Sequence, residues 1–305
     1  MRFGYDTGLV CQKLTESGPD RVGSLLNYLD TLFAEYILAT LIEAGSLANS
    51  IVVTPRTTKC STSEKGLVML AASRQLGMRN KILSALPHEE FAQLQPHLEE
   101  VHLKKGENIY LTGDNIKYAY FPENGLLSLL VTTRTGSTVE VASIGSEGVV
   151  GLPVILRSHV IPYEVTVQFP AAAWKIRAQR LQEEFDKGNT FHEVMLRYLN
   201  VFIAQISQSS ICNRFHPMNE ALSRWLLMVQ DRVNSDSLNL THETISHTLG
   251  VPRTAVTGAA LELQRAGAIR YMRGNISILD RTKLEEKSCE CYRIVRDELD
   301  HFLSQ

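Results

Sequence analysis

The chain has 305 residues, enough for two domains with separate cores, and it is 44% hydrophobic and 21% charged. Its net charge of −2 argues against a protein that coats nucleic acid through bulk positive charge, although a sequence-specific binder can confine positive charge to one face. Five scattered cysteines without a recognisable secretory signal indicate reduced thiols. The most apolar early segment, residues 31–47, contains two glutamates and is shorter than the roughly 20 apolar residues of a membrane span. We expect a globular cytoplasmic protein that does not cross a membrane.

Residues 1–77 form an N-terminal extension of unassigned role. Apolar residues in the first half of residues 25–47 have helical spacing, and residues 49–65 are rich in serine and threonine, as linkers are. Two interpretations remain open: a genuine appendage, or a translated upstream region that precedes a true start at Met78. The segment after Met78 has the character of an N-terminal pair of helices, which favours the second interpretation.

From about residue 101 to residue 176, short apolar segments alternate with glycines. The candidate strands cover residues 109–111, 118–121, 126–131, 139–144, 164–169 and 174–176. Short strands at near-regular spacing with turn signals between them predict a barrel or sandwich.

Helical periodicity returns at residues 191–215. Alternating four- and three-residue steps, which define the seam of a coiled coil, connect Met195, Leu199, Phe202, Ile206, Ser209 and Asn213. We expect a homodimer to form along this seam. The alternative is a core helix that packs on the barrel of its own chain. Residues 218–233 predict a further amphipathic helix, and residues 281–303 a charged one.

Residues 240–273 predict a helix, a tight turn, a second helix and a hairpin. Thr241 is a good N-cap for the first helix, and Gly250 followed by Pro252 separates the two helices. The turn of the hairpin falls at Arg273 and Gly274. This is the outline of a winged helix-turn-helix, whose second helix enters the major groove of DNA. An ordinary helical hairpin is the alternative.

The second helix of this unit is two-sided. One face carries the expected core residues Val256, Ala259, Ala260 and Leu263, and the other carries Thr254, Thr257, Gly258 and Arg265, with Arg253 at the edge. We expect Arg253, Thr254 and Thr257 to face base edges, because arginine can pair bidentately with guanine. We expect Thr241 and His242 to lie near phosphates. Arg273 on the wing is expected to reach the DNA backbone or the minor groove.

Two stretches resemble the Crp/Fnr family of bacterial transcription regulators. KKGENIYLTGDNIKYAYFPENGLLSLL is similar to the opening strands of the family's cyclic-nucleotide-binding β-roll. LNLTHETISHTLGVPRTAVTGAALELQRAGAIRYMRGNISILDRTKLE resembles its winged helix-turn-helix almost position for position. The resemblance implies an α+β fold, with a β-roll (a cyclic-nucleotide-binding-like jelly roll) as sensory domain. We place that domain at residues 78–188, a long dimerisation helix at 189–216, the winged helix-turn-helix at 217–285 and a C-terminal helical tail at 286–305.

In terms of function, the resemblance implies a homodimeric regulator that binds a near-palindromic operator in double-stranded DNA and contacts RNA polymerase. The competing class is an effector-binding or protein-interaction module whose DNA unit no longer reads DNA. An enzyme is not expected, because the sequence contains no glycine-rich phosphate loop, no G-x-S-x-G elbow and no HExxH helix.

The stretch GLPVILRSHVIPYEVTV departs from the family members that bind cyclic AMP. Those members place an acidic residue just after a glycine, for the ribose, and an Arg-Ser/Thr-Ala run for the cyclic phosphate. Here Leu152 stands at the acidic position, and Tyr163, Glu164 and Val165 replace the arginine-containing run. A buried phosphate would lose charge-assisted hydrogen bonds and face Glu164, so a response to cyclic AMP is not expected unless Arg157 substitutes.

The second helix of the helix-turn-helix, the recognition helix, also departs from the pattern of the family. Readers of the best-known operator of the family present Arg-Glu-Thr-Val-x-Arg, whereas residues 253–258 read Arg-Thr-Ala-Val-Thr-Gly. The first arginine is kept as Arg253, but Thr254 and Gly258 replace the glutamate and the second arginine. The operator is therefore expected to differ.

The cysteines do not indicate a metal or a cofactor. Cys11 and Cys60 are too far apart for the clustered cysteines of an iron–sulfur sensor. Cys289 and Cys291 lack two further clustered ligands. We interpret them as exposed structural cysteines in preference to a thiol switch or a metal shared across a dimer.

Overall fold

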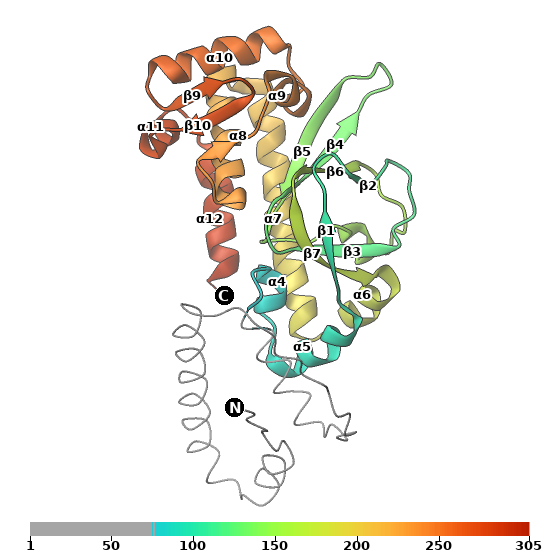
Figure 1. The fold of residues 1–305 in the computed structure, drawn as a ribbon. Helices are drawn as coiled ribbons and strands as arrows, with labels where there is room; N and C mark the ends of the chain where they lie inside the picture. Colours follow the sequence, from blue (N-terminus) through green and yellow to red (C-terminus); the bar gives the residue numbers. More distant parts are fainter. Residues whose placement is uncertain (1–74, 76, 305) are drawn as a thin grey trace, which may run out of the picture. The chain divides into compact units, whose positions relative to one another are not determined.

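The computed structural model describes residue 75 and residues 77–304 of the chain (Figure 1). Contacts divide the chain into residues 1–60 and 61–305, and every described residue lies in the second unit. The expectations for residues 1–74 therefore lie outside the described residues. Among the described helices, none has the length and apolar character that a membrane span requires.

The strands between residues 99 and 177 build a β-roll from two antiparallel sheets. The sheets have the strand orders β2-β6-β4-β5 and β1-β7-β3. The strands are β1 (Glu99–Leu103), β2 (Asn108–Tyr110), β3 (Tyr118–Pro122), β4 (Leu126–Thr132), β5 (Thr138–Ile144), β6 (Glu164–Phe169) and β7 (Ala171–Arg177). All six predicted strands are confirmed as β2 to β7, and β7 begins three residues earlier than the sequence pattern suggested. Strand β1 was not predicted.

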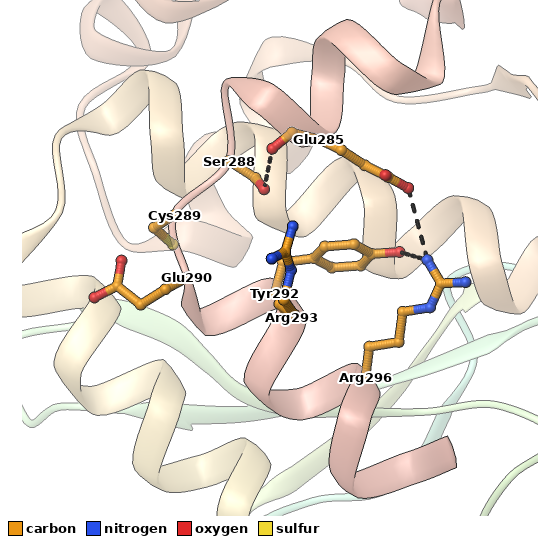
Figure 2. Close-up of a pocket in the computed structure, with 7 residues that line it drawn as sticks. All are labelled: Glu285, Ser288, Cys289, Glu290, Tyr292, Arg293 and Arg296. Atoms are coloured by element: carbon orange, nitrogen blue, oxygen red, sulfur yellow. Dashed lines mark hydrogen bonds and ion pairs between the residues drawn. The ribbon is translucent and has the colours of Figure 1, made fainter.

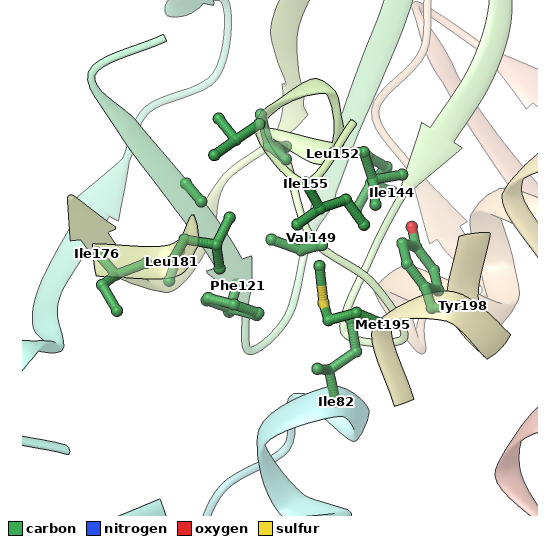
Figure 3. Close-up of a cluster of buried hydrophobic side chains, with 14 of the residues drawn as sticks. Ile82, Phe121, Ile144, Val149, Leu152, Ile155, Ile176, Leu181, Met195 and Tyr198 are labelled. Atoms are coloured by element: carbon green, nitrogen blue, oxygen red, sulfur yellow. The ribbon is translucent and has the colours of Figure 1, made fainter. Parts of the chain in front are cut away.

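Apolar side chains fill the interior of the roll (Figure 3). Buried residues from the sheets meet others from the loop before β6 and from the flanking helices. The labelled members are Ile82, Phe121, Ile144, Val149, Leu152, Ile155, Ile176, Leu181, Met195 and Tyr198. Leu152 is only 2% exposed. It lies in the short 3-10 turn Leu152–Val154, so its side chain belongs to the core.

Helices flank the roll and continue into the second half of the chain. They are α4 (Lys81–Ser84), α5 (His88–Leu94), α6 (Ala178–Phe185), α7 (Thr190–Phe215), α8 (Met218–Val233), α9 (His242–Leu249), α10 (Arg253–Arg265), α11 (Arg281–Glu286) and α12 (Cys291–Leu303). The predicted helix at residues 281–303 is wrong in one respect. It is interrupted at residues 287–290, and Asp280 caps the shorter α11 by accepting a hydrogen bond from the Lys283 amide.

The long helix α7 lies between the β-roll and α12 (Figure 1). The predicted seam is wrong in its register, because Met195, Phe202 and Ser209 are buried and the first two belong to the core of the chain's own roll. The opposite face is exposed and carries Leu196 (45% exposed) and Ile203 (55%).

Residues 218–284 form a second core around α8, α9 and α10, with a small antiparallel sheet of order β8-β10-β9. The strands are β8 (Ser237–Leu238), β9 (Ile269–Met272) and β10 (Asn275–Ile278). Trp225 is 1% exposed at the centre of this core. Leu126 and Phe169 of the β-roll belong to the same cluster, so the two halves share apolar packing. This arrangement confirms the predicted β-roll, long helix and winged helix-turn-helix.

Candidate nucleic-acid interface

The helix pair α9 and α10 is ended and restarted by local sequence signals. Thr241 Oγ1 accepts a hydrogen bond from the Thr244 amide at 3.0 Å, which caps α9 as expected. Gly250 ends α9 at φ 66°, a left-handed conformation that glycine adopts without a steric penalty. Pro252 precedes α10, which has no side-chain cap, so its first backbone N–H groups remain available to an anion such as a DNA phosphate.

The outer face of α10 is exposed and carries the residues that the sequence placed there. Arg253, Thr254, Gly258 and Arg265 are exposed, whereas Val256 and Leu263 are buried in the core. Neither Arg253 nor Arg265 forms an ion pair among the described residues, so both positive charges face solvent. Sequence reasoning missed Leu261, which is 47% exposed two turns beyond Thr254. Its apolar side chain on the outer face of α10 could have identified it from the sequence, since such residues can contact a thymine methyl group.

Thr257 and His242 are tied to each other across the two helices. The Thr257 hydroxyl donates a hydrogen bond to the Arg253 carbonyl at 3.0 Å. His242 Nδ1 lies 3.0 Å from the Thr257 hydroxyl oxygen. Because the hydroxyl proton is used, Nδ1–H of His242 is the donor in the second bond. The His242 ring also stacks on Tyr271 of β9, with centroids 4.0 Å apart.

The ring of His242 is held by contacts within the protein. Its Nε2 atom is buried and its Nδ1 atom is bonded to Thr257, so the ring does not offer a donor to a phosphate. Burial, and then the charge of Arg253, lower the pKa of His242 and favour the neutral ring. The side chain instead holds α9, α10 and the wing together.

The wing is a hairpin closed by a tight turn at Arg273 and Gly274. Both residues have positive φ, 48° and 80° respectively, as the type I′ turns of two-residue hairpins require. A Cβ on Gly274 would come within 3.3 Å of Thr241 Cγ2, so the turn lies against the N-terminus of α9. Arg273 is exposed and unpaired among the described residues, which leaves its guanidinium free at the tip.

The residues that stand where cyclic-AMP-binding members have their phosphate-binding cassette make contacts outside the core of the roll. Arg157 makes a two-pronged ion pair with Asp186, at 2.9 and 3.1 Å, and its side chain is 69% exposed. It points to the end of α6, not into the roll. Glu164 accepts a hydrogen bond from Thr166 at 2.9 Å on the same strand. The structure thus brings no arginine of this stretch into the core that Leu152 and Ile155 fill.

Two buried polar clusters join the β-roll to the helix-turn-helix unit. The carboxyl of Glu140 on β5 accepts hydrogen bonds from Ser128 Oγ at 2.5 Å and from Trp225 Nε1 at 3.0 Å. Arg232 of α8 pairs with Glu147 at 2.7 Å and donates to Gln205 of α7 at 2.9 Å. The two halves are therefore connected by directed contacts as well as by apolar packing.

Two sequence profiles match the chain. The profile of the cyclic nucleotide-binding domain matches residues 100–187, and that of the Crp-like helix-turn-helix domain matches residues 220–287. No curated protein matches the chain in sequence.

Several solved structures share this fold. FixK2 from Bradyrhizobium japonicum has a TM-score of 0.55 at 15% identity, covering 63% of this chain and 98% of its own. A putative transcriptional regulator of the Crp/Fnr family from Eubacterium rectale has a TM-score of 0.52 at 20% identity, covering 70% and 97%. The c-di-GMP-responsive global regulator CLP of Xanthomonas campestris has a TM-score of 0.52 at 13% identity, covering 63% and 99%.

A cyclic-nucleotide-binding-type roll followed by a Crp-like helix-turn-helix defines the architecture of a Crp/Fnr-type transcription regulator. The chain belongs to the Crp/Fnr family.

Proposed function

We propose that this chain is a sequence-specific DNA-binding transcription regulator that acts in the cytoplasm as a homodimer on a near-palindromic operator and contacts RNA polymerase. The observation that carries the proposal is the outer face of α10. It presents Arg253 and Thr254 to solvent, with no ion pair on the arginine among the described residues and an uncapped N-terminus at the same end. In a winged helix-turn-helix this face enters the major groove.

The roles of the individual residues follow from their positions. Arg253 and Thr254 read base edges, and Leu261 contacts a thymine methyl group farther along the groove. The N-terminal amides of α9, capped by Thr241, bind a phosphate, and Arg273 reaches the backbone from the wing. Thr257 also faces the base edges, in the position that its hydrogen bond with His242 fixes.

Dimerisation through the exposed face of α7 would supply the two reading heads that a palindrome needs. Leu196, Ile203 and Ser210 are seven residues apart on this face, and the serines at positions 207 and 210 are small enough for close helix approach. The half-sites would then lie one helical turn of DNA apart, roughly 34 Å.

Cyclic AMP is not the effector in this proposal. The ribose position is taken by buried Leu152, and Arg157 is committed to Asp186 at the surface. A cyclic phosphate in the roll would lack a cationic partner from this stretch, and burying an unpaired anion is costly.

Binding is tested with the operator that genome-wide footprinting identifies, as a labelled duplex in fluorescence anisotropy at several salt concentrations. We expect log Kd to change linearly with log salt, because each phosphate contact releases counterions. Arg273→Asn should lower this slope by about 1 and leave the fold intact, since asparagine tolerates positive φ. An absence of sequence-preferring binding at low salt, with and without cell extract, would favour the protein-interaction module instead.

Arg253→Ala separates base reading from phosphate contact. We expect a loss of about 1–3 kcal/mol that is confined to operators with the preferred base at one position per half-site. A uniform loss on all sequences would make Arg253 a phosphate contact and would contradict its assigned role.

A further inference from the structure

Four potential metal ligands meet where α7 ends and α12 begins. Cys212, His216, Cys289 and Cys291 place their ligand atoms within 4.8 Å of one another. Cys212 and His216 are four residues apart at the end of α7, so their side chains lie on one face of the helix. Cys289 and Glu290 lie in the segment that leads into α12 (Figure 2), and Cys291 is the first residue of that helix. The two pairs come from distant parts of the sequence and converge only in the fold.

Two of the distances between the ligand atoms match the edges of a tetrahedron around a single ion. Zinc–sulfur bonds of about 2.3 Å and a zinc–nitrogen bond of about 2.0–2.1 Å give tetrahedral edges of about 3.8 Å between sulfurs and about 3.6 Å between sulfur and nitrogen. Cys212 Sγ lies 3.6 Å from Cys289 Sγ, and Cys291 Sγ lies 3.6 Å from His216 Nδ1. The sulfur pair is too far apart for a disulfide bond, in which the atoms are about 2.05 Å apart, and all three cysteines are free.

The cluster is closed to solvent, which corrects the expectation of exposed cysteines at positions 289 and 291. Cys212 and Cys291 are 0% exposed and Cys289 is 4% exposed. Together with Ala221 they form a small buried cluster separate from the two main cores. The His216 side chain is 13% exposed. Four ligands without an open position are the arrangement of structural zinc sites, whereas catalytic sites keep one position open.

Two neighbours support the ligands as an outer shell. His216 Nε2 lies 3.3 Å from the carboxylate of Glu290, so a metal on Nδ1 would leave Nε2–H to donate to that carboxylate. This is the carboxylate–histidine arrangement that orients metal-bound imidazoles. Arg224 is 4% exposed and has no ion pair among the described residues, and its charge acts on Cys212 and Cys291. Three thiolates and one divalent ion leave a net charge of −1, which this buried guanidinium would balance.

We propose that the chain binds one structural Zn²⁺ ion through Cys212, His216, Cys289 and Cys291. Binding replaces three thiol protons, which leave to solvent, and involves no change of oxidation state. A single ion fits better than an iron–sulfur cluster, because a binuclear cluster separates its ligands into two pairs on different irons. The ion would fasten the C-terminal helix to the last turn of α7, next to the Pro217 junction at which α8 begins.

The metal content of the full chain is the first test. Protein purified without chelator should contain one zinc per chain, and Co²⁺ substitution should give the visible absorption of a tetrahedral ion with thiolate-to-cobalt bands in the near ultraviolet. The three site cysteines should resist alkylation until a chelator is added. Metal-free protein that takes up no Co²⁺ overturns the proposal, as does a Cys212–Cys289 disulfide in freshly purified protein.

Variants assign the ligands. Cys289→Ser and His216→Gln should each lose most of the bound zinc, at least ten-fold in affinity, whereas His216→Cys should keep it, with stronger thiolate-to-cobalt absorption. The matched control is the double variant Cys11→Ser with Cys60→Ser, which removes two thiols outside the described residues and should retain one zinc. Loss of zinc in this control overturns the assignment. Cobalt titration of the wild-type chain keeps the test valid if a ligand variant fails to fold.

The outcome is independent of the proposed DNA binding. Zinc content, alkylation and cobalt spectra report on the cluster without DNA. A chain that binds zinc and no operator would refute only the proposed function, and one that binds operator without any zinc would refute only the metal site.

Discussion

Gly258 lies on the outer face of α10, and a Cβ built on it meets no atom within 4 Å. Packing within the chain therefore does not require a glycine here, although glycine in a helix costs roughly 0.5–1 kcal/mol relative to alanine. A close approach of the helix backbone to DNA would give the glycine a role, since a side chain would then separate the helix from the base edges.

Gly258→Ala should raise the free energy of unfolding by about 0.5–1 kcal/mol and weaken operator binding. Urea denaturation measures the first effect and anisotropy the second. Gly267→Ala is the control, because Gly267 ends α10 at φ 73°, where alanine is strained and the substitution should destabilise the protein. Unchanged operator affinity in Gly258→Ala would show that α10 does not approach DNA at this residue.

Residue-level predictions succeeded where they depended on local signals. The cap at Thr241, the break at Gly250 and the two faces of α10 follow from neighbouring residues and helical spacing. The contacts of His242 could not be predicted in this way, because its stacking on Tyr271 and its hydrogen bond with Thr257 join residues from three separate elements. The cluster of Cys212, His216, Cys289 and Cys291 was missed for the same reason, since its two contacts join residues that are 75 and 77 positions apart in the sequence.

Among the elements, α7 shows what periodicity determines and what it leaves open. The length of the helix was predicted to within one residue at its start, because apolar spacing persists over residues 191–215. Which apolar stripe faces the chain's own roll is a tertiary question, and here the stripe through Met195 and Phe202 is taken by the core. The short strand β8 (Ser237–Leu238) was also missed, because two residues carry no alternation.

The outward face of α7 leads to a prediction about assembly. Ile203→Glu should raise the dimer dissociation constant at least ten-fold, because burying an isoleucine is worth about 1.5–3 kcal/mol and a two-fold interface contains the change twice. Sedimentation equilibrium measures the constant. Leu111→Glu is the control, because Leu111 is 51% exposed, close to the 55% of Ile203, but lies next to β2. Equal effects of the two substitutions would argue against this dimer face.

At the scale of the whole molecule, the junction between roll and helix-turn-helix contains two buried carboxyl groups in different settings. Glu147 is paired with Arg232, and its side chain is 9% exposed. Glu140 is held by the neutral donors Ser128 and Trp225. Burial raises the pKa of Glu140, although both hydrogen bonds and the charges of Arg224 and Arg232 oppose the shift. Folding therefore shifts the pKa of Glu140 upward.

This difference predicts opposite effects for two similar substitutions. A carboxyl whose folded pKa is raised stabilises the fold fully below its unfolded value, here about 4.5, and loses that contribution as pH rises through the folded value. Glu140→Gln keeps the acceptor for Trp225 and cannot ionise, so its stability relative to wild type should increase as pH rises from about 4.5 toward neutrality.

Glu147→Gln should instead destabilise the chain by about 3–5 kcal/mol, because it leaves buried Arg232 without its anion. Urea denaturation of the three proteins between pH 4.5 and 8 measures both effects. A difference in unfolding free energy between Glu140→Gln and wild type that stays constant with pH would mean that Glu140 does not titrate in this range. Glu140 would then contribute no pH dependence to the contact between the roll and the helix-turn-helix unit.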